Sequence, residues 1–176
     1  QASRIRFLTG IISMPIHHPA MLASQVAAAD LLTNGRIMVG IGRGHPWVIN
    51  RLGVNPTESA ARFEEGIRML VEIFKGEYIE NLDGEFWQLR DFKLSPMPVQ
   101  RPHPPIYTAA ATTPASASFA GKIGQGLVQP GYLGIPFELV RGLTETYRNN
   151  LPATSKSDVV LGIHLHVARD REQAID

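Results

Sequence analysis

The sequence predicts an α/β protein in which parallel strands alternate with helices. Short apolar runs rich in β-branched residues recur along the chain, and segments with apolar residues at helical spacing separate them. Strict alternation favours parallel strands joined by right-handed crossovers. The strand pattern of 37–41 ends in Gly42-Arg43-Gly44. Ligands bind at such carboxyl ends of parallel strands, and arginine suits phosphate because it donates two parallel hydrogen bonds.

Proline and glycine mark the boundaries of the elements in the first half of the chain. Pro19 and Pro56 suit the first turn of a helix, which needs no backbone N–H from that residue. Asn34-Gly35 and Gly76 suit helix ends. The expected elements are a strand over 4–14, a helix over 19–32, a strand over 36–41, an irregular stretch over 42–55 and a helix over 56–75.

Each of these helices is expected to bury one face. In the second helix, Glu64 and Arg68 form a favourable i,i+4 pair, and Glu65 belongs to the same solvated face. Trp47 and Trp87 are expected to be packing residues. The apolar stripe of the first helix is Met21, Leu22, Val26, Ala29 and Leu32.

A hairpin interrupts the alternation. The runs 78–82 and 85–89 flank Asp83-Gly84, a dipeptide typical of tight β-turns. A proline-rich linker follows up to Pro105. The remaining elements are expected to be strands over 105–111, 126–129 and 158–168, and helices over 114–123 and 136–150, with Thr113 as a helix cap and Asp170 opening one more helix.

Composition narrows the class of protein. The 176 residues fit one domain, 1–176, and the net charge of +1 gives no electrostatic case for nucleic acid or a membrane surface. Cysteine is absent, which excludes disulfides, thiolate metal sites and a Cys nucleophile and fits a cytoplasmic protein. No apolar run approaches the length of a membrane span. The chain begins with Gln1, so its true start is expected to lie upstream.

Several motifs in order along the chain resemble the bacterial luciferase-like monooxygenase family, which also contains F420-dependent oxidoreductases. The resemblance implies a partial TIM (β/α)8 barrel of about five βα units with a β-hairpin insertion, truncated at both ends, because a whole barrel needs about 250 residues. The motifs are Thr9-Gly10-Ile11, 15–19, 29–36, 40–44, Arg62 to Gly66, Asp83-Gly84 and 104–107.

The resemblance also implies where a flavin would bind. Arg43 matches an arginine that contacts the flavin phosphate, and Thr112 and Thr113 fall where the family has a polar pair. The helix that begins after Thr113 would add N–H groups and a favourable dipole for an anion. Gly10-Ile11 matches a non-proline cis peptide beneath the isoalloxazine ring. No catalytic acid or base is assigned.

Simpler roles remain open for these residues. Arg43 could pair with a carboxylate, and Thr112 and Thr113 could serve only the helix N-terminus. His18 and His45 are expected on the substrate rim, although a structural role competes for each. His164 and His166 share one strand face and could hold a metal, but no third ligand stands nearby, so no metal is expected.

The resulting functional hypothesis is a luciferase-like flavin-dependent monooxygenase. Reduced FMN, supplied by a separate flavin reductase, and O2 would oxygenate a small organic substrate, and the family resemblance implies a homodimer. The nearest alternative is an F420-dependent oxidoreductase that transfers hydride. A metal-dependent barrel hydrolase and a non-catalytic barrel fragment are alternatives of other classes.

Overall fold

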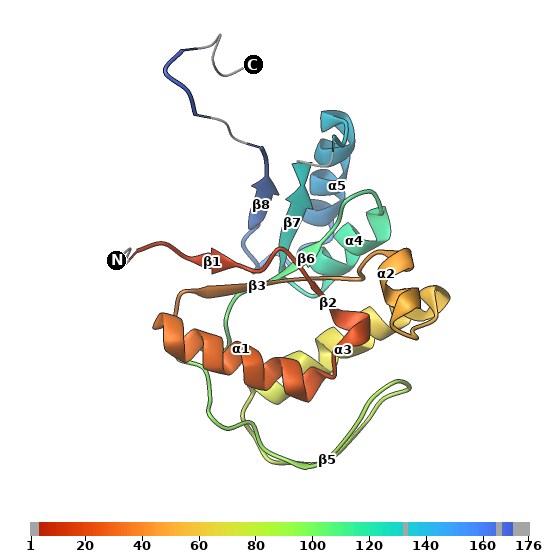
Figure 1. Ribbon diagram of the computed structural model, residues 1–176, viewed down its shortest axis with the longest axis vertical. Coiled ribbons are helices and arrows are strands. Elements are labelled where there is room, and N and C mark those ends of the chain that lie inside the picture. The colour runs from red at the N-terminus through yellow and green to blue at the C-terminus, as the bar shows by residue number, and fades with distance from the viewer. Residues whose placement is uncertain (1–3, 132–133, 165–166, 171–176) are drawn as a thin grey trace. The chain divides into compact units, whose positions relative to one another are not determined.

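A computed structural model describes residues 4–131, 134–164 and 167–170 (Figure 1). The chain forms two compact units, residues 1–109 and 110–176. Parallel strands alternate with helices in both, so the predicted α/β class is confirmed.

The sheet of the first unit is built on β3 (Ile37–Gly42), which pairs in parallel with three other strands. These are β1 (Phe7–Leu8), β2 (Ile12–Ser13) and β6 (Ile106–Ala109). The single strand expected over 4–14 is therefore wrong in detail. Leu8 pairs with Met38 and Ile12 with Ile41, so this segment has one residue more than the stretch of β3 that it faces.

Two long helices lie side by side below this sheet in Figure 1, α1 (Pro19–Thr33) and α3 (Ser59–Phe74). The predicted stripe of α1 is wrong at both ends, because Met21 and Leu32 are 62% and 88% exposed while Leu22 and Val26 are buried. Three short helices complete the unit, η1 (Met14–Ile16), α2 (Pro46–Arg51) and η2 (Pro56–Glu58). The stretch expected to be irregular therefore contains a helix, which Pro46 begins.

A buried carboxylate joins α1 to the proline-rich linker. Asp30 is fully buried, and its two oxygens accept from the backbone N–H of Gln100 at 2.9 Å and from its side-chain amide at 2.7 Å. The same amide donates to the carbonyl of Ile37, at the start of β3, at 2.8 Å. Because the linker precedes β6, this network holds the chain where β6 can pair with β3.

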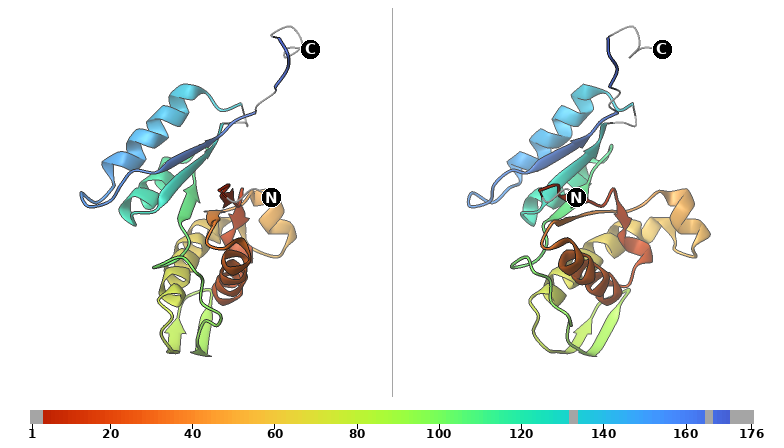
Figure 2. Two further views of the ribbon diagram at one scale, coloured as in Figure 1. Left: turned by 90° about the vertical axis from the view of Figure 1, so that its left-hand side faces the viewer. Right: turned by 60° about the vertical axis from the view of Figure 1, so that its left-hand side comes forward.

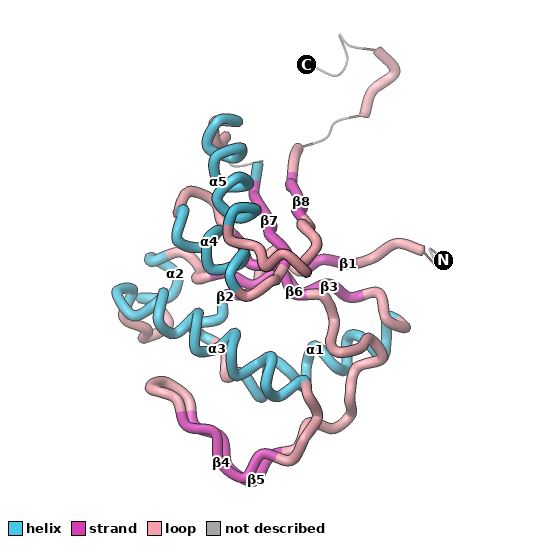
Figure 3. The backbone as a smooth tube through the Cα atoms, turned by 180° about the vertical axis from the view of Figure 1, so that it is seen from behind, coloured by secondary structure: helices cyan, strands magenta, loops and turns pink. Residues whose placement is uncertain are grey.

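The predicted hairpin is present beside α3 (Figure 3) and consists of β4 (Ile79–Asp83) and β5 (Gln88–Phe92). Its turn is longer than the Asp-Gly dipeptide predicts, because Asp83 pairs with Gln88 and leaves residues 84–87 as the loop. Trp87 in this loop is 9% exposed, so its predicted packing role is confirmed.

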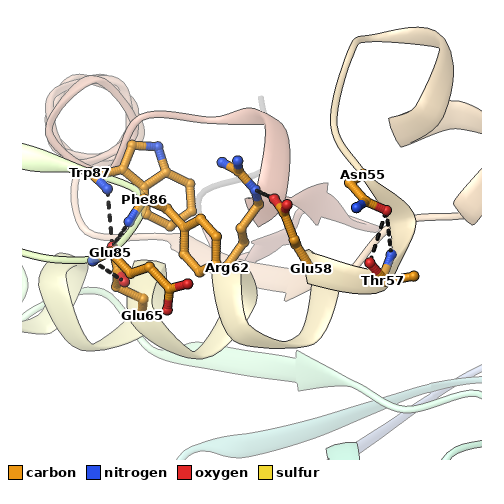
Figure 4. A network of polar contacts seen from close by, with 8 residues as sticks. All are labelled: Asn55, Thr57, Glu58, Arg62, Glu65, Glu85, Phe86 and Trp87. Carbon is orange, nitrogen blue, oxygen red and sulfur yellow. Dashed lines mark hydrogen bonds and ion pairs between the residues drawn. The ribbon is translucent and has the colours of Figure 1, made fainter.

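One carboxylate of α3 fixes the hairpin loop (Figure 4). Glu65 accepts from the backbone N–H groups of Glu85 at 2.8 Å and of Phe86 and Trp87 at 3.0 Å each. Arg62 stacks on the Phe86 ring at 4.4 Å. The prediction of a solvated Glu65 is therefore wrong, whereas the predicted pair of its neighbour Glu64 with Arg68 is confirmed at 3.2 Å.

In the second unit, too, strands alternate with helices along the chain (Figure 2). The strands β7 (Gly126–Pro130) and β8 (Val159–Gly162) pair in parallel, and α4 (Pro114–Lys122) packs with α5 (Phe137–Asn149). Tyr147 is fully buried, and its hydroxyl donates to the Gln125 carbonyl at 2.9 Å. The expected strand 158–168 is shorter, and the expected helix after Asp170 lies outside the described residues. Over the described ranges, no helix has the length and apolar character needed to span a bilayer.

Replacing Asp30 tests the network at the linker. Asp30→Asn should lower the free energy of unfolding by about 2 kcal/mol, because the new amide group turns a donor toward donors of Gln100. Urea denaturation measures this change. Gln25→Asn, at an exposed position of the same helix, is the control and should change the value by less than about 0.5 kcal/mol. Equal effects of the two substitutions would contradict the assigned role.

Replacing Glu65 tests the hairpin anchor. Glu65→Gln removes the charge and one of the two acceptor oxygens, so the amides of Glu85, Phe86 and Trp87 should exchange hydrogen at least about tenfold faster than in the parent protein. Hydrogen exchange followed by mass spectrometry gives the rates. The neighbouring Glu64→Gln should leave them unchanged, and unchanged rates in both variants would refute the anchor.

Candidate functional site

The interruption between β1 and β2 is stabilised by one side chain. The Thr9 hydroxyl accepts from the backbone N–H of Gly40 at 2.8 Å and donates to its carbonyl at 3.0 Å. A single hydroxyl thus satisfies both backbone groups of Gly40 where the ladder is broken. The peptide bond Gly10-Ile11, directly after Thr9, is cis, so the conformation predicted there is confirmed.

Two glycines of β3 make room for this interruption. A Cβ on Gly40 would lie 2.1 Å from the Thr9 carbonyl oxygen, and a Cβ on Gly42 would lie 2.3 Å from Ile11 Cδ1. The space that a side chain at Gly42 would need is thus taken by the Ile11 side chain. Gly10 differs, because it is exposed and a Cβ there would meet nothing within 4 Å. Ile11 is 39% exposed, so this segment presents an open surface.

Arg43 follows β3 at its carboxyl end, as predicted. The turn after it is fixed by Gly44, which has φ +74° and on which a Cβ would lie 2.7 Å from Ser13 Oγ. A side chain is thus excluded by both conformation and space. Gly42 pairs with Ser13 at the end of β2, so the loop that carries Arg43 lies over the ends of two adjacent strands.

The two rim histidines occupy helix N-termini. His18 is the N-cap of α1, where its Nδ1 accepts from the Ala20 N–H at 3.2 Å. A neutral ring that accepts at Nδ1 carries its proton on Nε2, which is then a donor. His45 precedes α2 and makes no capping bond through its side chain, but its ring stacks on Trp47 at 5.8 Å. Trp47 itself is 62% exposed, so the predicted packing role is wrong for this tryptophan.

Thr112 and Thr113 belong to the second unit. They follow β6 and precede α4, as predicted, and Thr113 occupies the N-cap position. Its side chain makes no capping hydrogen bond, whereas its carbonyl accepts from the Ser116 N–H at 3.1 Å. Thr112 is exposed.

The metal hypothesis gains no support from the geometry. His166, one half of the pair considered for a metal, lies outside the described residues. Within the described part of the chain, no three His, Cys, Asp or Glu side chains are grouped so that they could hold an ion.

A groove of about 510 Å³ lies away from these residues, between α3 and the hairpin. Three of its carboxylates are engaged within the protein, since Glu64 pairs with Arg68, Glu72 pairs with Lys75 and Glu65 binds the hairpin loop. Arg68 is the basic residue that lines this groove, and it is paired with Glu64. The groove is therefore a poor site for an anionic cofactor.

The sequence missed three contributors to the site. Thr9 stood in a quoted motif, but only the register of β1 and β2 reveals what its hydroxyl does. Ser13 determines the space at Gly44, and this contact joins residues far apart in sequence. The exposure of Trp47 could have been suspected from the neighbouring Pro46, which begins a short helix after the strand.

The whole chain is similar to proteins of one known family. The family model described as luciferase-like monooxygenase matches residues 1–176. The chain is 32% identical to the flavin-dependent trigonelline monooxygenase, oxygenase component, of Acinetobacter baylyi, over 99% of this chain and 49% of the relative. It is 27% identical to the F420-dependent glucose-6-phosphate dehydrogenase of Amycolatopsis mediterranei, over 100% of this chain and 54% of the relative. The chain thus spans about half the length of these curated relatives.

A solved structure confirms the fold. The crystal structure of monooxygenase RslO1 from Streptomyces bottropensis matches with a TM-score of 0.86 and 30% sequence identity, over 98% of this chain and 54% of that one. The predicted α/β class, as part of a (β/α)8 barrel, is therefore confirmed.

Substitutions at Thr9 test the interruption of the strand. Thr9→Val keeps the shape but removes both hydrogen bonds to Gly40, so the free energy of unfolding should fall by about 2 kcal/mol. Thr9→Ser keeps the hydroxyl and should recover most of that loss. Urea denaturation of both variants separates hydrogen bonding from packing, and equal stability of the Val and Ser variants would contradict the role of the hydroxyl.

Proposed function

The chain belongs to the luciferase-like monooxygenase family, and from that premise we propose that it forms the cofactor-binding part of a monooxygenase that uses reduced FMN and O2. The substrate is a small organic molecule. Reduced FMN supplies the electrons for the activation of O2. A separate flavin reductase delivers it, in keeping with the name "oxygenase component" of the relative from Acinetobacter baylyi. The whole protein acts as a homodimer in the cytoplasm.

The observation that carries this proposal is the spacing along β3 between two proposed cofactor-binding positions. The open Gly10–Ile11 segment lies beside Gly40, and Arg43 follows three residues later. At about 3.3 Å per residue, the two are about 10 Å apart along the strand. The ribityl chain between the ring and the phosphate of FMN can span such a distance. The residues present therefore fit an FMN molecule with its ring on Gly10–Ile11 and its phosphate at Arg43.

The remaining site residues have supporting roles in the proposal. Thr112 and Thr113 offer hydroxyl groups, and the N-terminus of α4 offers backbone N–H groups, and both kinds of donor suit an anionic part of a cofactor. His18 presents its Nε2 donor, and His45 its ring, on the substrate rim. The protein's own contribution is to hold the flavin, orient it and exclude water from the reacting atoms.

An F420-dependent oxidoreductase is the second candidate. The similarity to the glucose-6-phosphate dehydrogenase from Amycolatopsis mediterranei supports it. F420 also carries a phosphate on the side chain of its ring system, so Arg43 would serve either cofactor. This candidate transfers hydride and needs no O2.

Replacing Arg43 tests the phosphate contact. Arg43→Ala should weaken the binding of reduced FMN by about 10- to 100-fold, because a charge-assisted hydrogen bond to phosphate is lost. Riboflavin lacks the phosphate, so its affinity should not change. Anaerobic fluorescence titration measures both. Arg68→Ala, on the exposed face of α3, is the matched control, and equal loss for FMN and riboflavin would refute the phosphate role.

The choice of cofactor is tested on the purified protein. Anaerobic titration with reduced FMN and with reduced F420 should show at least about tenfold tighter binding of FMN. Tighter binding of F420 would establish the hydride-transfer candidate instead. Binding of neither cofactor would leave the non-catalytic barrel fragment as the better description.

A further inference from the structure

Trp47 is a large aromatic side chain that the proposed cofactor contacts leave unused. It lies on α2, which begins two residues after Gly44, and is 62% exposed, whereas the other tryptophan, Trp87, is 9% exposed. The helix that carries it follows the carboxyl end of β3, the edge at which parallel α/β proteins bind ligands.

The orientation of the indole is restrained by its neighbours. The His45 ring stacks on it with centroids 5.8 Å apart and an angle of 18° between the planes. The Arg51 guanidinium lies 5.8 Å from the centroid of the indole. Ile49 on the same helix is fully buried, which anchors α2 in the unit, and its N–H donates to the His45 carbonyl at 3.1 Å within the first turn of the helix. Trp47 therefore presents a positioned aromatic surface.

The chemistry of this surface selects a ligand class. An indole stacks favourably on a planar aromatic ring, and the gain exceeds that of an aliphatic ring of equal area. Arg51 adds a positive charge, because its guanidinium lies over the indole ring on an exposed side chain. Guanidinium binds a carboxylate through two parallel hydrogen bonds. A ring and a carboxylate on one small molecule would match both groups.

We propose that Trp47 and Arg51 determine substrate specificity, with the indole stacking on a planar aromatic ring and the guanidinium binding its carboxylate. The substrate class is thus an aromatic carboxylate. This inference rests on the proposed function, in which the flavin binds at the Gly10–Ile11 segment and Arg43 and does not contact α2. His45 extends the aromatic surface on the same rim.

The test uses the fluorescence of Trp47 in a Trp87→Phe background, where it is the sole tryptophan. Titration with 4-nitrobenzoate should quench the emission saturably. Cyclohexanecarboxylate, which has the charge but no aromatic ring, should compete at least about tenfold more weakly than benzoate. Arg51→Gln should weaken binding of 4-nitrobenzoate by about tenfold, and Arg68→Gln, the control at another exposed arginine, should not.

A second set of variants measures binding without relying on Trp47 emission. By calorimetry, Trp47→Leu should bind 4-nitrobenzoate at least about tenfold more weakly than the parent, and Trp47→Phe should keep most of the affinity. Equal affinity in the Leu variant, or equal competition by the aliphatic acid, would overturn the proposal. So would Trp47 emission that depends on protein concentration and not on the acid, since the patch would then be a contact between copies.

Flavin titrations on the same variants separate the two proposals. FMN affinity should be unchanged in Trp47→Leu and Arg51→Gln, because neither residue contacts the cofactor in the proposed arrangement. Aromatic acid binding in a protein that binds no FMN would contradict the proposed function alone. FMN binding with no preference for the aromatic acid would contradict the specificity proposal alone.

Discussion

The double hydrogen bond between the Thr9 hydroxyl and the backbone of Gly40 is the interaction on which the candidate site depends. A strand that pauses beside its neighbour normally leaves an N–H and a carbonyl without partners, and burial makes that costly. Here one hydroxyl replaces both partners, so β2 can resume pairing one residue out of step with β1. Gly10 and Ile11 then form no pair in the ladder: Gly10 is exposed, and Ile11 packs against Gly42 while it stays 39% exposed.

Glycine is required on the other side of this contact for a steric reason. At Gly40 the neighbouring carbonyl oxygen, and at Gly42 the Ile11 side chain, occupy the volume that a Cβ would need. Gly44 differs, because its positive φ allows the chain to turn next to Ser13, directly after Arg43 at the end of the strand. Three glycines at alternate positions thus serve three separate contacts. Together they place the Gly10–Ile11 segment beside β3 and Arg43 directly after its end.

Local patterns predicted much of this architecture, and long-range contacts account for the rest. Helical spacing and proline placed α1, α3, α4 and α5 to within a few residues, because these signals act within one turn. The role of Glu65 was not predictable, since its partners are backbone groups about 20 positions away that only the hairpin brings near. Met21 and Leu32 match the helical period, yet nothing in a periodic pattern says whether another element covers that face.

The candidate site shows the same division. The cis bond at Gly10-Ile11 was predictable because it belongs to a short motif with a matching position in a known family. The position of Arg43 directly after β3 followed from the apolar strand pattern. The burial of Trp47 was predicted wrongly, because tryptophan is highly buried on average. Trp47 is exposed on the short helix that Pro46 begins. The proposed cofactor contacts depend on β3 and its register, which the sheet itself also requires. Contacts that would select a substrate lie on α2, which is held through Ile49 and leaves its outer residues free to vary. The proposed substrate contacts could therefore change without altering the proposed cofactor contacts, because α2 contributes no strand to the sheet built on β3.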